Sequence, residues 1–531
     1  MTVGLDVIVV GGGFGGLYAL HRLRQDGYSV KLLEAADSIG GTWYWNRYPG
    51  ARCDVESMQY SYSFSNEIQQ EWKWSEVYAA QPEILAYINF VADRLDLKRD
   101  VQLNTRVASA RFDEASSAWE VMTEAGQAFV ARYCVMATGC LSIPMVPDFP
   151  GLKDFKGPVY RTSDWPHEGV DMTGKRVGLI GTGSSGIQAT PILAGQATHL
   201  YVFQRTPNYS IPALNRPMTA EYERSWKDNY PERRLAARET RNNTLNMAGT
   251  KPGCDVSREE REAEFERRWT QLGGISFMYA YPDMTSDPAV NAHASDFVRR
   301  KIGALVRDPE VAEKLMPSDY GIGGKRICVD TAYFETFDRS NVTLVDIRSD
   351  SIERLTATGL KTKSQSFDLD VVVLATGFDA MTGALKRIGI TGRAGVKLTD
   401  RWAEGPKTYI GMAVAGFPNL FLITGPQSPS VFTNMVTSVE QHVDWIADCV
   451  AYLKTNRRKA IEATAEAEAK WVAHSNDLAS KTMMPKANSW YVGANIPGKP
   501  RIFMPYLGGA AVYQEYIADV ARKNYEGFRL A

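Results

Sequence analysis

The sequence has few of the residues from which metal sites and redox disulfides are built. It holds six cysteines and six histidines in 531 residues. The cysteines stand singly, at Cys53, Cys134, Cys140, Cys254, Cys328 and Cys449. A zinc site needs clustered thiolates or imidazoles, and a redox dithiol needs two thiols close together. We therefore expect no protein-bound metal and no catalytic disulfide.

An excess of charge of one sign and long apolar runs are also absent. The net charge is −1, with 44% hydrophobic and 23% charged residues, which is ordinary for a soluble globular protein. No apolar run approaches the roughly 18–20 residues of a membrane span, and the first apolar strand begins too near the initiator for a signal peptide. We expect a cytoplasmic monomer or weak homo-oligomer that binds neither nucleic acid nor membrane.

Two glycine-rich segments have the spacing of dinucleotide-binding turns. They read DVIVVGGGFGGLYAL and KRVGLIGTGSSGIQA. Their G-x-G-x-x-G glycines are Gly11, Gly13 and Gly16 in the first and Gly181, Gly183 and Gly186 in the second. Each segment follows an apolar run typical of a strand and precedes a helical pattern, so a pyrophosphate can lie at a helix N-terminus. Two such motifs in this context predict two bound dinucleotides.

The residues at the end of the next strand differ between the two motifs. Glu34 lies eighteen residues after Gly16 and can accept hydrogen bonds from an unphosphorylated ribose. The matching position after the second motif has Gln204, Arg205 and Thr206, with a guanidinium in place of a carboxylate. A guanidinium favours a 2′-phosphate. The contrast indicates FAD at the first site and NADPH at the second.

The order of motifs predicts an α/β fold with two Rossmann-like dinucleotide-binding domains, parallel sheets and a helical insertion. Both halves share a plan: a glycine motif, a second strand, and a later strand that ends in A-T-G. A proline-rich connector, IPMVPDFPGL, separates them. We assign residues 1–140 and 385–531 to an FAD-binding domain, 141–220 and 326–384 to an NADP-binding domain, and 221–325 to the insertion. The insertion is either an elaboration of the second domain or a domain of its own.

Two helices are predicted by local signals. Ser257 and Glu260 have capping-box spacing at the start of SREEREAEFERRWTQL, where Phe265 and Trp269 share a helical period. Near the C-terminus, VEQHVDWIADCVAYL has the pattern of an amphipathic helix.

Several longer motifs resemble those of the Baeyer–Villiger monooxygenases. GGTWYWNRYPGARCD, Gly40 to Asp54, is similar to that family's flavin-side motif, and FKGPVYRTSDWP, Phe155 to Pro166, is similar to its connector fingerprint. Further matching segments are GKRICVDTAYFETF, ATGFDAMTGAL, NSWYVGANIPGKP and YEGF. The resemblance runs essentially from end to end of the chain.

One position departs from the family fingerprint. Arg161 stands where the family has a histidine. Arginine only donates hydrogen bonds and stays charged, whereas a neutral histidine also accepts and titrates near pH 7. The departure puts a histidine-specific or pH-responsive linker role in doubt but leaves the oxygenation chemistry untouched. The alternative is a linker position that either side chain serves.

The resemblance implies an oxidoreductase that uses NADPH, FAD and molecular oxygen to convert ketones to esters or lactones. In that family the reaction passes through a C4a-peroxyflavin and a tetrahedral (Criegee) adduct. Arg326 matches the active-site arginine that stabilises the peroxide anion and the oxyanion of the adduct, and Asp54 matches the carboxylate that positions this arginine. Lys325 matches a contact to the NADPH phosphate.

The glycine motifs and the resemblance together define the candidate ligand contacts. The candidate flavin contacts are Gly11, Gly13, Phe14, Gly15, Gly16, Glu34, Gly41, Thr42, Trp43, Asp54, Tyr60, Arg106, Val107 and Met435. The candidate nicotinamide-dinucleotide contacts are Gly181, Thr182, Gly183, Ser184, Ser185, Gly186, Gln188, Arg205, Thr206, Lys325, Arg326 and Trp490. The candidate ketone-pocket residues are Ser430, Val431, Phe432 and Met435. Trp43, Trp45 and Tyr48 are expected to pack around the flavin ring.

Three alternatives share parts of this pattern. A flavin monooxygenase that acts mainly on sulfides or amines uses the same cofactors. A pyridine-nucleotide disulfide reductase also binds two dinucleotides, but it needs a redox-active cysteine pair, which the sequence lacks. A non-catalytic flavin-binding module is the third, and the paired Asp54 and Arg326 motifs argue against it.

Overall fold

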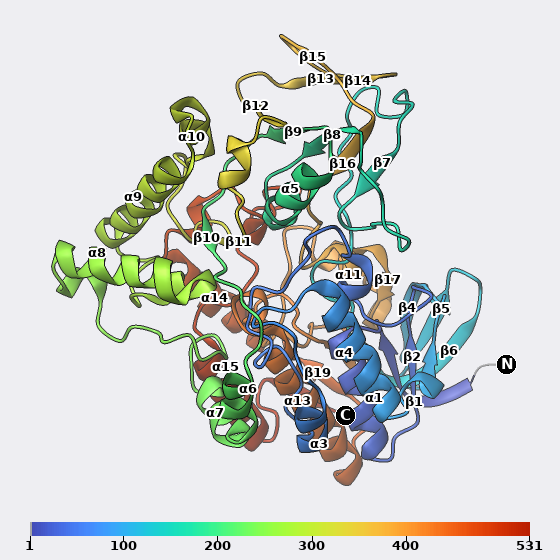
Figure 1. The fold of residues 1–531 in the computed structure, drawn as a ribbon. Coiled ribbons are helices and arrows are strands. Elements are labelled where there is room, and N and C mark those ends of the chain that lie inside the picture. Colours follow the sequence, from blue (N-terminus) through green and yellow to red (C-terminus); the bar gives the residue numbers. More distant parts are fainter. Residues whose placement is uncertain (1–2) are drawn as a thin grey trace.

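The computed structural model describes residues 3–531, which form two α/β units, each built around its own sheet (Figure 1). The first sheet has eight strands, of which seven run in the order β17-β4-β5-β6-β1-β2-β3, while β18 pairs with β6. The strands are β1 (Val3–Val10), β2 (Val30–Leu33), β3 (Val101–Gln102), β4 (Val107–Asp113), β5 (Ala118–Thr123), β6 (Ala128–Met136), β17 (Gly389–Thr391) and β18 (Leu420–Leu422).

Strand β1 is buried on both faces. Val7 and Val9 pack with the helices α1 (Phe14–Gln25), α4 (Gln81–Arg94) and α13 (Met435–Thr455), while Ile8 belongs to a second cluster around Trp119. Double burial of this kind is typical of a parallel sheet with covered faces. β1 is indeed parallel to β2 and β6. The antiparallel meander β4-β5-β6 is not predicted by the sequence motifs.

The second sheet is entirely parallel, in the order β12-β9-β8-β16-β7. Its strands are β7 (Val159–Arg161), β8 (Arg176–Ile180), β9 (His199–Gln204), β12 (Val342–Asp346) and β16 (Val371–Leu374). Helix α5 (Ser184–Gln196) covers one face. A small antiparallel sheet covers the other, since Leu355, Leu360 and Phe367 pack against Phe203 and Leu374. Its strands, β13 (Ile352–Thr356), β14 (Gly359–Thr362) and β15 (Ser366–Asp368), were not predicted.

The predicted helical insertion packs on both units. It begins after β10 (Ser210–Pro212) and ends before β11 (Cys328–Asp330), and these two strands pair in parallel. Its helices are α6 (Ala220–Lys227), α7 (Tyr230–Arg238), α8 (Arg258–Arg267), α9 (Pro288–Leu305) and α10 (Pro309–Leu315). Trp226 and Tyr230 belong to the core of the first unit, whereas Phe265 and Phe297 belong to the core of the second. Figure 1 shows α8–α10 beside the second sheet and α6–α7 below them.

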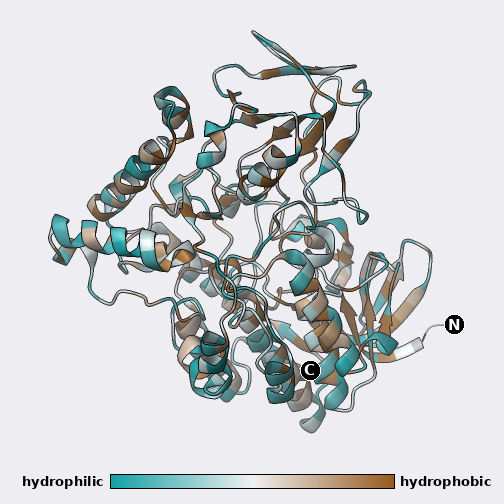
Figure 2. Ribbon diagram, viewed as in Figure 1, coloured by the Kyte–Doolittle hydropathy of each residue, from teal (hydrophilic) through white to brown (hydrophobic). Residues whose placement is uncertain are grey.

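Local helix signals are confirmed where the structure tests them. Ser257 accepts from the backbone N–H of Glu260, and the Glu260 side chain accepts from that of Ser257, so the capping box is formed. In Figure 2 the ribbon of α8 is coloured mostly as hydrophilic, and the one buried residue of this helix is Phe265.

The C-terminal segment returns to the first unit. Helices α13, α14 (Ala465–Ser480) and α15 (Ala510–Arg522) pack there, with the small ribbon of β19 (Ile461–Ala463) and β20 (Phe528–Leu530). The predicted amphipathic helix starts earlier than expected, at Met435, and residues 436–443 are buried on every side. It is therefore a central helix of the core. Among the helices within residues 3–531, none has the length and apolar content needed to cross a bilayer.

A buried histidine, His442, links this central helix by a hydrogen bond to the loop at Thr424. The backbone N–H of Thr424 donates to His442 Nδ1 at 3.0 Å, and His442 Nε2 lies 2.8 Å from Tyr513 Oη. Tyr513 in turn donates to the Ile410 carbonyl. Because Nδ1 accepts, the ring proton lies on Nε2 and the ring must be neutral. Burial accordingly lowers the pKa of His442 to about 3.

The third glycine of each motif brings its helix against its strand. A Cβ at Gly16 would overlap the carbonyl oxygen of Gly11, and a Cβ at Gly186 would overlap that of Gly181. We expect Gly186→Ala to destabilise the protein by about 2 kcal/mol or more, because the obstructing atom is backbone and cannot swing away. Urea unfolding followed by circular dichroism measures this.

Gly195 on the same helix is the matched control, since no atom lies within 4 Å of its added Cβ. Gly195→Ala should stabilise the protein by about 0.5–1 kcal/mol. Equal effects of the two substitutions would contradict the packing role of Gly186.

The hydrogen bonds of neutral His442 predict that the stability of the fold decreases in acid. The folded pKa of His442, about 3, is below the unfolded value of about 6.5. Its contribution to stability is therefore complete above pH ~6.5 and falls by at most about 1.4 kcal/mol per pH unit as the pH drops toward 3. His442→Gln should lower stability at pH 8 and flatten the decline between pH 6.5 and 4. Thermal midpoints across this range measure it, with the exposed His167→Gln as control; parallel curves for His442→Gln and wild type would contradict it.

Candidate active site

One large cavity, of about 1120 Å³, has walls from both α/β units. Small-molecule pockets usually measure about 300–1,000 Å³, so this space exceeds that of a single small ligand. Both glycine motifs and both A-T-G segments contribute to its wall, and residues of the first unit's central helix join them.

Most of the candidate contacts meet at this cavity. Those that line it are Gly11, Gly13, Phe14, Gly15, Glu34, Gly41, Thr42, Trp43, Asp54, Tyr60, Arg106, Val107, Gly181, Thr182, Gly183, Ser184, Ser185, Gln188, Arg205, Thr206, Lys325, Arg326, Val431, Met435 and Trp490. The candidates outside the lining are Gly16, Gly186, Ser430 and Phe432.

These four lie one layer behind the wall. Gly16 and Gly186 pack their helices against their strands. Ser430 is fully buried against the Met381 sulfur. The Phe432 ring packs 4.7 Å from that of Tyr491, in an apolar cluster that also contains Phe503. They support the cavity wall from behind.

The first glycine motif forms a pocket suited to a dinucleotide with a free ribose. No side chain caps helix α1, so its first N–H groups remain available to a phosphate. Glu34 is 6% exposed. Its two oxygens accept from the backbone N–H groups of Gly12 and Ala36, one each, and each oxygen keeps a lone pair for a ribose hydroxyl.

Aromatic side chains and the start of a helix border the same part of the cavity. Trp43 Nε1 donates to Tyr60 Oη at 3.1 Å, and the Phe14 and Tyr60 rings meet edge to face at 5.5 Å. Helix α13 begins here, capped by the Asn434 side chain, and Met435 lines the cavity. The partial positive charge of a helix N-terminus favours anionic atoms placed before it.

The second glycine motif has a cationic rim. Helix α5 also starts without a side-chain cap, and a Cβ at Gly183 would meet open space. Arg205 and Lys325 both line the cavity, and neither has an ion-pair partner within residues 3–531. Burial and the nearby Arg205 charge lower the pKa of Lys325. A phosphate at this rim would relieve the repulsion between the two cations.

Asp54 and Arg326 form an ion pair between the two nucleotide pockets. Arg326 Nη2 and Nε lie 2.7 and 3.1 Å from Asp54 Oδ2, and Nη1 donates to the Val431 carbonyl. The two side chains are 28% and 25% exposed, because both border the cavity. Burial disfavours the guanidinium charge, but the Asp54 carboxylate outweighs it and raises the pKa of Arg326. The arginine therefore stays charged while it faces the cavity.

Trp490 belongs to a segment whose other contacts the sequence analysis missed. Lys499 pairs with Asp379 at 2.5 Å, and Asn495 donates to the Phe378 carbonyl at 2.7 Å. Asn495 also lines the cavity. Both segments, NSWYVGANIPGKP and ATGFDAMTGAL, were identified by resemblance, but their sequences contain no sign that they meet.

Arg161 pairs with a neighbouring carboxylate, and Tyr48 packs in a hydrophobic core. Arg161 lies on edge strand β7, and its Nη2 pairs with Asp164 Oδ2 at 2.8 Å, with the side chain 42% exposed. It is thus a paired residue near the surface. Tyr48 lines the cavity, but its ring is part of the core of the second unit.

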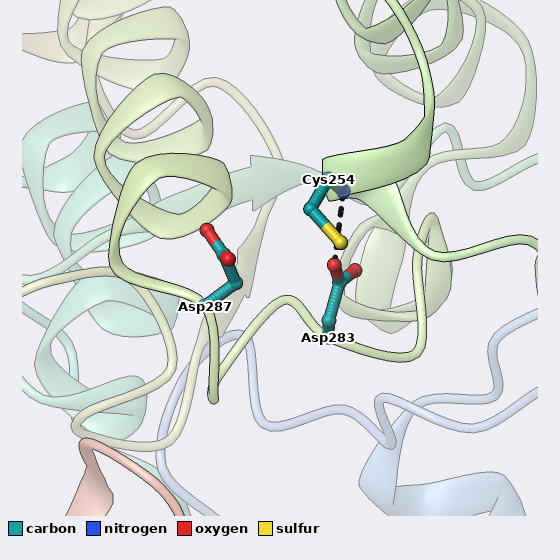
Figure 3. Close-up of side chains that lie close together, drawn as sticks. All are labelled: Cys254, Asp283 and Asp287. Atoms are coloured by element: carbon teal, nitrogen blue, oxygen red, sulfur yellow. Dashed lines mark hydrogen bonds between the residues drawn. The ribbon is translucent and has the colours of Figure 1, made fainter.

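One cluster of possible metal ligands lies within the described part of the chain, at Cys254, Asp283 and Asp287 (Figure 3). Both Asp283 oxygens accept from backbone N–H groups, of Gly253 and Cys254. Asp287 caps α9. The two carboxylates thus have structural roles, and the cluster supports no metal assignment.

Comparisons with known proteins agree with this arrangement. Residues 5–230 match the family model described as pyridine nucleotide-disulphide oxidoreductase. The chain is 42% identical to cyclohexanone 1,2-monooxygenase from Acinetobacter sp., over 98% of this chain and 96% of that protein. It is also 42% identical to a Baeyer–Villiger monooxygenase from Pseudooceanicola batsensis, over 99% of this chain and 96% of that protein.

Solved structures give the same result. The structure of an oxidized steroid monooxygenase bound to NADP has a TM-score of 0.96 and 52% identity, and the match covers 99% of both chains. Other structures in this group are complexes with FAD and NADP. With relatives of this identity along its whole length, the chain belongs to the flavin-dependent Baeyer–Villiger monooxygenases.

Proposed function

We propose that this chain is an NADPH- and oxygen-dependent flavin monooxygenase that converts ketones to esters or lactones. The observation that carries the proposal is one cavity that joins two nucleotide pockets of opposite ribose chemistry, with a charged arginine between them. Its family membership supports the same reaction.

The residues fit two different cofactors. FAD would be held by the α1 N-terminus, by Glu34 at a ribose, and by the aromatic wall around Trp43 and Tyr60. NADPH would be held by the α5 N-terminus, with Arg205 and Lys325 at the 2′-phosphate. Bound together, these two cofactors would supply the reducing electrons and the activation of molecular oxygen for insertion beside the ketone carbonyl.

Arg326 supplies the fixed positive charge that this chemistry needs. A guanidinium has five N–H donors, and three hydrogen bonds to Asp54 and the Val431 carbonyl hold this one in place. Two donors remain for negative charge that develops on a substrate oxygen. Since the ion pair is already formed, little reorganisation is needed when that charge appears.

The proposed reaction defines ketones as the substrate class, and a screen of ketones identifies which of them the enzyme converts. Three relatives are named for ketones, namely cyclohexanone, acetone and cyclopentanone, and one is named as a phenazine N-monooxygenase, so the names favour ketones over amines. The apolar cluster behind Phe432 contains Tyr491 and Phe503, and it gives the wall beside Arg326 an apolar, aromatic backing. This wall suits the hydrocarbon part of a ketone.

The role of Arg326 is tested by substitution. Arg326→Ala should keep its FAD but lose ester formation by about 10²–10³-fold, the usual cost of removing one preorganised donor to an oxyanion. The assay supplies NADPH, air and a ketone panel that includes cyclohexanone, and it quantifies esters by gas chromatography and hydrogen peroxide in parallel.

Arg354→Ala, which breaks an exposed ion pair with Asp154, is the matched control and should retain activity. Full activity of Arg326→Ala would remove the role assigned to it. Faster turnover of sulfides than of ketones by the wild type would favour the alternative function.

The cationic rim predicts the choice of nicotinamide cofactor. Arg205→Ala should weaken binding of NADPH by about 10–100-fold, since a charge-assisted hydrogen bond contributes about 1.5–3 kcal/mol. Binding of NADH, which lacks the 2′-phosphate, should change little and is the internal control. Michaelis constants for the two cofactors measure this, and an unchanged preference would refute the phosphate contact.

A further inference from the structure

A short segment of the first unit is inserted into the second. Residues 48–52 belong to the Gly40–Asp54 motif of the first unit, yet Tyr48 and Ala51 are buried within the core cluster of the second unit. That cluster includes Ile187 and Ala189 of helix α5. The contact between the two units is therefore a packed one at this point.

The side chain of Gln188 on α5 bonds to both ends of the segment. Its Oε1 accepts from Tyr48 Oη at 2.7 Å, and its Nε2 donates to the Arg52 carbonyl at 3.2 Å. Both polar atoms of the carboxamide are thus occupied by groups of the other unit. Burial raises the pKa of Tyr48 to about 12, so its hydroxyl keeps the proton that it donates.

Gly50 makes this approach possible. Its φ is +84°, and a Cβ there would overlap the backbone carbonyl oxygen of Gln188. The segment therefore approaches α5 more closely than any residue with a side chain would allow. Between the two hydrogen bonds of Gln188, the backbone itself lies against the helix.

Helix α5 also supports the strand next to Arg326. Ser184, at the start of α5, lies 3.5 Å from the sulfur of Cys328 on β11, and the helix packs against that strand. Arg326 is two residues before Cys328, and Asp54 is two residues after Arg52. Helix α5 thus contacts the chain close to Asp54 and close to Arg326, and these two partners of the ion pair come from different units.

We propose that Gln188 is a positioning residue that holds segment 48–52 on α5 and thereby sets Asp54 against Arg326. This role takes the place of the contact to the nicotinamide dinucleotide that the sequence suggests for Gln188, because both polar atoms of its carboxamide bond to the segment, and it rests on the proposed function for its effect on catalysis. Its effect on the segment itself is independent of that function.

The test compares Gln188→Met with Gln196→Met in the enzyme loaded with FAD and NADP⁺. Gln196 is the exposed last residue of the same helix, so the control makes the same change away from the interface. Amide hydrogen exchange of residues 48–54 should be at least about fivefold faster in Gln188→Met, as expected for the loss of about 1 kcal/mol of hydrogen bonding. It should be unchanged in Gln196→Met.

The second measurement is ester formed per NADPH oxidised. This ratio should fall at least about fivefold in Gln188→Met, with a Michaelis constant for NADPH close to that of the wild type. A general loss of structure would instead lower NADPH oxidation and ester formation together and leave their ratio unchanged. If the wild type formed no ester at all, the proposed function would fail, while the exchange measurement would still decide the role of Gln188.

Tyr48→Phe removes one hydroxyl and serves if Gln188→Met does not fold. It should accelerate exchange in the same segment to a smaller extent. Unchanged exchange in either folded variant would overturn the proposal. So would a raised Michaelis constant for NADPH with unchanged exchange, which would make Gln188 a cofactor contact.

Discussion

The ion pair between Asp54 and Arg326 is the interaction on which the rest of the site depends, because its partners come from different units. A partly buried ion pair is weak evidence for stability, since desolvation offsets much of the attraction. Its value here lies in orientation: the carboxylate and the Val431 carbonyl together leave the guanidinium few ways to turn. A shift of one unit against the other would break this pair or move its charge relative to the nucleotide pocket of the first unit.

The two nucleotide pockets have the same backbone arrangement but different side chains at the ribose position. In each, a glycine lets the helix approach its strand, and the uncapped helix start faces the cavity. The proposed selectivity between the cofactors depends on side chains at the rim of each pocket. The Glu34 carboxylate is oriented by two backbone N–H groups, whereas Arg205 and Lys325 repel each other until an anion arrives. A carboxylate at the second rim would reverse that preference.

Features set by neighbouring residues could be predicted from the sequence, and those set by distant contacts could not. The glycine motifs, Glu34 and the Ser257 capping box depend on spacing within about twenty residues, and the structure forms each as a local unit. The burial of α13 depends on helices that pack around it from elsewhere in the chain. The bond from Tyr48 to Gln188 joins residues 140 positions apart. Aromatic residues near a flavin motif suggest a ring pocket, and only the folded chain shows Tyr48 in the other unit's core.

The apolar wall and the two glycine motifs come from different parts of the chain, which has a consequence for substrate range. The wall is supported by Phe432, Tyr491 and Phe503, in segments far along the chain from both glycine motifs. Under the proposed function, substitutions at Phe432 or Phe503 would change the shape beside Arg326 while both glycine motifs, Glu34 and Arg205 stay in place. Under the proposed function, Arg326 would face the ketone carbonyl, which all substrates of this class share, and the wall would contact the hydrocarbon part, which differs between them. A ring ketone and a steroid, for which two relatives are named, differ in the part of the molecule that such a wall would contact.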